Sequence, residues 1–177
     1  GAHGNDENGY YSGHIRVYNF NNGSWDQLGA DIDGENAGDE SGYSVSLSAD
    51  GTIVAIGAKY NDRNGSNSGH VRVYNFNGTD WAQMGADIDG EAVNDYSGYS
   101  VSLSADGTTV AIGAPYNDGN GNNSGHVRVY KFTSDVWTQM GDDIDGEAAY
   151  DLSGYSVSLS ADGSIVAIGA IFNDGNG

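Results

Sequence analysis

The sequence has no cysteine, a single proline, and only six lysine and arginine residues against 25 aspartates and glutamates. Without cysteine, the chain can form neither disulfides nor thiolate metal sites. Its net charge of −19 repels phosphate backbones, which argues against nucleic acid as a partner. No apolar run reaches 18 residues, so the sequence predicts no membrane-spanning segment.

Glycine is abundant, and it lies within a strict internal repeat. The stretch 42–58 returns at 98–114 and again at 154–170, each time 56 residues further on. We therefore divide the chain into repeats at 1–56, 57–112 and 113–168, with 169–177 as the start of a fourth repeat. Because the chain begins and ends inside a repeat, we expect it to be a fragment of a longer repeat array.

Each repeat contains four candidate strands. In the best example, residues 99–104 alternate apolar and polar side chains, and an Asp-Gly turn leads to a second strand at 108–114. The third candidate covers 126–132, and the fourth runs from Trp137 to about Ile144. No segment has the 3.6-residue apolar period of a helix. The sequence predicts an all-β chain of tandem four-stranded antiparallel blades, either as a β-propeller or as an open superhelical stack of the same units.

Three recurring motifs resemble a known family. They are Tyr-Ser-Val-Ser-Leu-Ser-Ala-Asp-Gly, Val-Ala-Ile-Gly-Ala (followed once by Pro115) and Ser-Gly-His-Val-Arg-Val-Tyr. Together they resemble the FG-GAP repeat, which builds the propeller of integrin α-chains and of many secreted or surface proteins. The resemblance covers essentially the whole chain and implies a propeller in an extracellular or cell-surface protein.

Two departures from the family limit what the resemblance implies about calcium. Serine replaces the phenylalanine of the FG motif in every repeat, at Ser41, Ser97 and Ser153. The aspartate-rich calcium loop of the integrin type is reduced to residues 48–51 and their copies. The resemblance therefore does not imply calcium binding at that position.

An acidic link between repeats is the first candidate cation site. Carboxylates two residues apart on a strand point to the same side, where their repulsion favours a hard cation such as calcium. The alternative is a solvated hairpin turn that binds nothing. The candidate residues are Asp31, Asp33, Glu35 and Asp39, then Asp87, Asp89, Glu91 and Asp95, then Asp143, Asp145, Glu147 and Asp151.

A second candidate for calcium is the Asn-Asp loop that follows the second strand. Its carboxylates recur at Asp6, Asp62, Asp118 and Asp174. Asx-turns explain such a loop without a metal, so that alternative stays open.

Three further side chains recur once per repeat. Arginine occurs in the third strand, where we expect it to pair with a neighbouring carboxylate. Histidine stands at the start of that strand, and one histidine per repeat without cysteine does not indicate a zinc site. Tryptophan is expected to cover blade edges or to fill space between blades, with an aromatic sugar platform as the alternative. These residues are Arg16, Arg72 and Arg128; His14, His70 and His126; and Trp25, Trp81 and Trp137.

The repeats contain no unique nucleophile with its base and no phosphate-binding motif, so we expect no enzyme activity. Two functions remain. The first is an extracellular structural or adhesive segment that builds a rigid scaffold or filament by self-association or with further repeats of the same chain. The second is a propeller module that recognises a glycan or protein ligand through its loops. For the second, the variable turns at 21–24, 77–80 and 133–136 are the candidate recognition segments.

Overall fold

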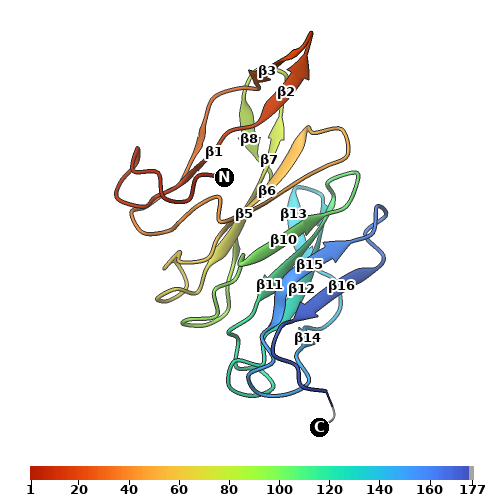
Figure 1. Ribbon diagram of the computed structural model, residues 1–177. Helices are drawn as coiled ribbons and strands as arrows, with labels where there is room; N and C mark the ends of the chain where they lie inside the picture. The colour runs from red at the N-terminus through yellow and green to blue at the C-terminus, as the bar shows by residue number, and fades with distance from the viewer. Residues whose placement is uncertain (176–177) are drawn as a thin grey trace.

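The computed structural model describes residues 1–175, and every regular element in that range is a β-strand (Figure 1). Strands with two-residue alternation form antiparallel sheets, as the sequence predicts. Two of the sheets are complete blades. The first full blade contains β5 Ser44–Leu47, β6 Ile53–Ala58, β7 His70–Phe76, β8 Trp81–Gln83 and β9 Ile88–Asp89. The second full blade contains β10 Ser100–Leu103, β11 Thr109–Ala114, β12 His126–Thr133, β13 Val136–Gln139 and β14 Ile144–Asp145.

The chain carries a partial blade at each end. The N-terminal half-blade has only the outer strands: β1 His14–Ile15 pairs with β4 Ile32–Asp33, and β2 Tyr18–Asn21 pairs with β3 Ser24–Gln27. The C-terminal half-blade has only the inner pair, β15 Ser153–Leu159 and β16 Val166–Ala170. The sheets are thus offset from the sequence repeats, because each full blade takes its first two strands from one repeat and the others from the next. Of the expected fourth repeat, residues 176–177 lie outside the described part.

The fourth strand differs from the sequence prediction. Instead of one strand from Trp137 to Ile144, the chain forms β13 and β14, which both pair with β12. Gly141 lies between them with a φ of 73°, a conformation that glycine adopts without steric cost. The segment between Gln139 and Ile144 is longer than the part of β12 that it faces, so the chain forms a bulge between the two strands.

Apolar side chains fill the space between neighbouring blades. On β6, Val54 and Ile56 pack toward the N-terminal half-blade, whereas Ala55 lies in the cluster shared with the second full blade. On β11, Val110 and Ile112 repeat this arrangement one blade further on. Both faces of each full blade are therefore buried, which explains the almost continuous apolar sequence of the second strands.

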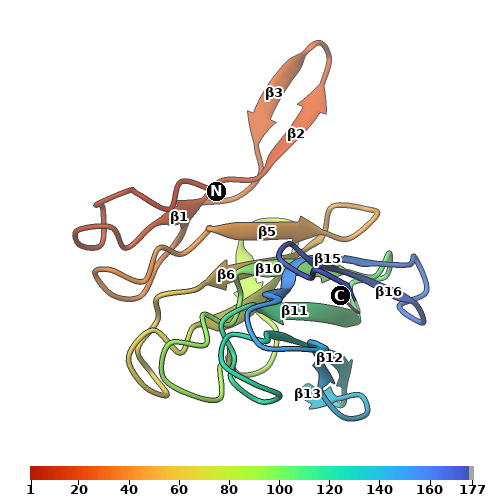
Figure 2. The ribbon, with the colours of Figure 1, turned by 60° about the horizontal axis from the view of Figure 1, so that its bottom comes forward.

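The inner strands β5, β10 and β15 lie side by side (Figures 1 and 2). Serine side chains join them: the Ser46 hydroxyl oxygen accepts the backbone N–H of Leu103 at 3.0 Å, and Ser102 accepts that of Leu159 at 2.9 Å. The described residues thus form propeller-type blades in sequence order, and within residues 1–175 they do not close a ring.

Candidate functional site at the blade junctions

Tryptophan and arginine connect each full blade to the one before it. The indole N–H of Trp81 donates to the carbonyl oxygen of Leu28 at 2.8 Å, and Trp137 donates to that of Met84 at the same distance. As expected from the sequence, these indoles fill space between blades. Trp25 has no preceding blade among the described residues and is 67% exposed.

The arginines pair with carboxylates, also as expected. Arg72 lies 3.3 Å from the Glu35 carboxylate and donates to the carbonyl oxygen of Asp33 at 2.9 Å. Arg128 repeats both contacts one blade later, at 3.2 Å from Glu91 and 2.9 Å from the carbonyl oxygen of Asp89. The third carboxylate of the first two links, Glu35 and Glu91, therefore bridges two blades.

The remaining carboxylates of each link lie in other environments. In the first link, Asp31 pairs with Arg16 of its own half-blade at 2.8 Å, and the hydrogen bond from Arg16 lowers the pKa of Asp31. Asp33 is exposed beside it on β4. Asp39 is buried, and burial raises its pKa although it accepts a hydrogen bond from Asn61 at 2.9 Å. The four carboxylates of a link thus do not converge on one point.

The later links follow the same division. Asp87 and Asp143 lie beside the histidine of their own blade, while Asp95 and Asp151 accept hydrogen bonds from Asn117 and Asn173. Asp89 lies 3.7 Å from Arg63, Asp145 is exposed on β14, and Glu147 lies near Asn173.

In the second candidate loop, the carboxylates accept hydrogen bonds from backbone N–H groups of the same loop. Asp62 accepts the N–H of Asn67 at 2.7 Å, and Asp118 accepts that of Asn123 at 2.7 Å. Asp6 makes the same bond to the N–H of Tyr11. Asp174 is exposed near the end of the described part. Calcium at either loop stays a prediction.

The structure places carboxylates beside each of the three repeated histidines. His70 is 1% exposed, and its Nδ1 lies 3.9 Å from Asp87 without a hydrogen-bond partner among the described residues. Burial, with a smaller effect from Arg72, lowers the pKa of His70 to about 4. His126 is equally buried, and burial lowers its pKa as well. Burial thus favours the neutral imidazole in both residues, and a neutral imidazole has a lone pair to offer.

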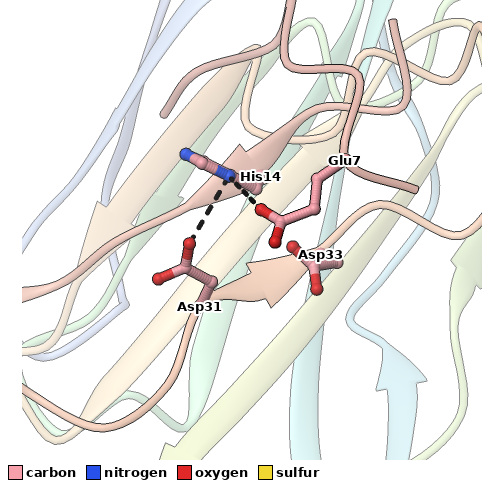
Figure 3. A group of neighbouring side chains, drawn as sticks. All are labelled: Glu7, His14, Asp31 and Asp33. Carbon is pink, nitrogen blue, oxygen red and sulfur yellow. Dashed lines mark ion pairs between the residues drawn. The ribbon is translucent and has the colours of Figure 1, made fainter. Parts of the chain in front are cut away.

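The cluster around His14 is the largest of the three. The Nδ1 of His14 faces Glu7 and Asp31, and Asp33 lies beside Glu7 (Figure 3). Each of the four residues offers an atom within 4.8 Å of the others. The histidines were not predicted from the sequence to be ligands. The signal that could have found them is that an aspartate follows each histidine at a fixed interval across a predicted strand pair.

A tyrosine-lined groove of about 620 Å³ lies at another set of loops. Tyr60, Tyr96, Tyr99 and Tyr116 line it, together with Lys59. The ammonium group of Lys59 lies 4.3 Å from the ring centre of Tyr60. The variable turns predicted as recognition segments lie elsewhere, between the two outer strands of the N-terminal half-blade and of the two full blades.

Comparison with known proteins identifies the family. Residues 31–74 and 86–130 match the FG-GAP repeat, together just over half of the chain. The chain therefore belongs to the FG-GAP repeat family and is a β-propeller-like repeat module. Proteins of this family are typically extracellular or located at the cell surface.

Comparison of structures supports the fold alone. The crystal structure of a putative 6-phosphogluconolactonase from Bacteroides uniformis is similar with a TM-score of 0.60 and 12% sequence identity. The similar region covers 89% of this chain and 41% of the other, so this chain spans about two fifths of that protein. No curated protein matches the sequence. Residues 1–175 contain no helix long and apolar enough to cross a membrane.

Proposed function

We propose that this chain is a segment of an extracellular structural repeat protein, without enzyme activity, whose blades stack into a rigid scaffold. The observation that carries the proposal is the repeated blade junction. The bonds made by Trp81 and Arg72 recur at Trp137 and Arg128 with nearly the same distances. A junction that is repeated this closely can add further blades without a change in geometry.

The two ends of the chain complement each other. The N-terminal half-blade has outer strands and lacks inner ones, whereas the C-terminal half-blade has inner strands and lacks outer ones. Arg16 and Trp25 are exposed at one end, and Met140 and Glu147 at the other. These are the donors and acceptors of the repeated junction. A second copy, or further repeats of the same chain, would complete the split blade.

The size of the particle in solution tests this proposal. We expect the chain to form species larger than its 18.4 kDa monomer as concentration rises, with end-to-end contacts visible by negative-stain microscopy. Trp25→Ala should reduce this association without changing the circular dichroism spectrum, because the side chain is exposed in the single chain. Parallel samples with calcium and with chelator test the calcium prediction. A monodisperse monomer at all concentrations would contradict self-assembly.

A second candidate function is recognition of a glycan at the tyrosine-lined groove. The observation that favours it is four tyrosine rings and one lysine around an open groove, since aromatic faces pack on the C–H faces of sugars. Tyr60→Ala should abolish binding to any hit on a glycan array. Tyr18→Ala removes an exposed tyrosine outside the groove and is the matched control. An array without selective hits would count against this function.

A further inference from the structure

We propose that Glu7, His14, Asp31 and Asp33 bind one divalent transition-metal ion of the zinc class. The side chain of His14 is 7% exposed, and its Nδ1 has no hydrogen-bond partner in residues 1–175. That nitrogen points at the carboxylates, 3.6 Å from Asp31 and 3.8 Å from Glu7 (Figure 3). A buried nitrogen without a partner is costly, and a ligand at this point removes the cost.

The distances fit a shared metal ion better than they fit hydrogen bonds. The distances from His14 Nδ1 to Asp31 and to Glu7 both exceed the normal range for a nitrogen-to-oxygen hydrogen bond. A tetrahedral zinc ion with ligands at about 2.1 Å would hold two ligand atoms about 3.4 Å apart, which is slightly less than these distances. Glu7 is 62% exposed and Asp33 is exposed, so both side chains have room to close the remaining gap.

The negative charge of the cluster also favours a bound cation. Glu7, Asp31 and Asp33 bring three negative charges. Arg16 pairs with Asp31. Arg72, which donates to the carbonyl oxygen of Asp33, is itself paired with Glu35. Arg16 contacts Asp31 through two of its nitrogens, which fixes the carboxylate in the manner of an outer-shell partner in metal sites. Two negative charges remain, which one divalent ion would neutralise.

The next repeat shows what occupies the same place there. The position of Glu7 corresponds to Arg63 one repeat later, and the guanidinium group of Arg63 contacts Asp87 and lies 3.7 Å from Asp89. These two aspartates are the counterparts of Asp31 and Asp33. In the first full blade, Asp87 and Asp89 are thus paired with the cationic side chain of Arg63. In the N-terminal half-blade, Glu7 takes the place of that arginine and adds a fourth potential ligand.

The third cluster is incomplete in a different way. Position 119 is glycine and offers no ligand. The cluster around His126 consists of Glu91 and Asp143, and Glu91 is held by Arg128. Four candidate ligands occur together only around His14 within the described part of the chain. We therefore assign one tight site per chain.

The ligand set selects the class of metal. Calcium and magnesium prefer oxygen ligands throughout, whereas an imidazole nitrogen with carboxylates suits zinc, cobalt and related ions. The proposal differs in this respect from the calcium site predicted from the acidic links, and it does not depend on self-assembly.

Equilibrium dialysis with Zn²⁺ and the visible absorption of bound Co²⁺ test the proposal on the whole chain. We expect one tight equivalent per chain, the absorption of a four-coordinate Co²⁺ ion, and no displacement by excess Ca²⁺. His14→Gln should weaken binding about 100-fold or more, because it removes a direct ligand. His126→Gln and His3→Ala should leave the tight equivalent in place.

Exchanging the residues at positions 7 and 63 gives the sharpest test. Glu7→Arg places a guanidinium group in the cluster on an exposed side chain, so the chain should stay folded and lose the tight equivalent. Arg63→Glu should create a second equivalent beside His70. The proposal is overturned if wild-type protein binds no Zn²⁺ tightly, if Glu7→Arg or His14→Gln retains full binding, or if Ca²⁺ binds as tightly as Zn²⁺.

Discussion

The indole nitrogen of Trp81 lies 2.8 Å from the carbonyl oxygen of Leu28, which belongs to the preceding half-blade. Replacing this tryptophan by phenylalanine should keep most of the packing and remove the hydrogen bond. We expect Trp81→Phe to lower the free energy of unfolding by about 1–2 kcal/mol in urea titrations. The matched substitution Trp25→Phe removes an exposed indole and should change the free energy of unfolding by less than about 0.5 kcal/mol. Equal effects of the two substitutions would mean that the junction bond contributes nothing.

The serine contacts between inner strands allow a second comparison. Ser102→Ala leaves the backbone N–H of Leu159 without its acceptor, which should cost about 1–2 kcal/mol of stability. Ser158 is the equivalent residue in the C-terminal half-blade and is exposed. Ser158→Ala should therefore be nearly neutral when both variants are unfolded in urea. The interpretation fails if Ser102→Ala is neutral as well.

Gly113 lies where two blades meet with almost no space. A β-carbon there would overlap the carbonyl oxygen of Gly154 and the hydroxyl of Ser100. We expect Gly113→Ala to destabilise the fold by about 3 kcal/mol or more, seen as a large fall in melting temperature. Gly4→Ala is the control, since its nearest neighbour would be a Tyr11 ring carbon at 3.7 Å. A melting temperature unchanged by Gly113→Ala would rule out this close approach.

The aspartates of the hairpin turns should govern stability in acid. Hydrogen bonds from Ser160 and Ser164 lower the pKa of Asp162 to about 2. Since the folded-state pKa lies below the ordinary value of 3.8, the folded state holds this proton less tightly than the unfolded state does. The contribution of Asp162 is therefore complete above about pH 4 and is lost as the pH falls toward 2.

Melting curves of Asp162→Asn across this range measure the effect. The variant should melt below the wild type at pH 7, and the difference should shrink between about pH 4 and pH 2. Asp142→Asn changes an exposed carboxylate for which the described residues provide no hydrogen bond, so it should follow the wild type. A difference that stays constant with pH would contradict the assignment.

The repeat, the first three strands of each blade and the family could be predicted from the sequence. Alternation marks a strand such as β10, and the continuous apolar run of β11 reflects burial on both faces. The strand order within a blade followed from the sequence, but the repeat bounds did not coincide with the blades, since a 56-residue period has no starting point and β6 pairs with a strand of the next repeat. The sequence also did not predict that the carboxylates of one acidic link contact different blades. Asp31 and Glu35 are close in sequence, yet one contacts its own half-blade and the other contacts Arg72 of the next.

Local stability should vary widely along this chain. The hairpin of β2 and β3 projects from the body of the molecule (Figure 2), and all eight of its strand residues are exposed. By contrast, every residue of β11 is buried between two neighbours. Amide protons of the hairpin should exchange with solvent through small local openings, and those of β11 only when the whole structure opens. The outer hairpin at the N-terminal end is thus a separately opening unit, whereas a second strand enclosed between two blades opens only with the whole structure.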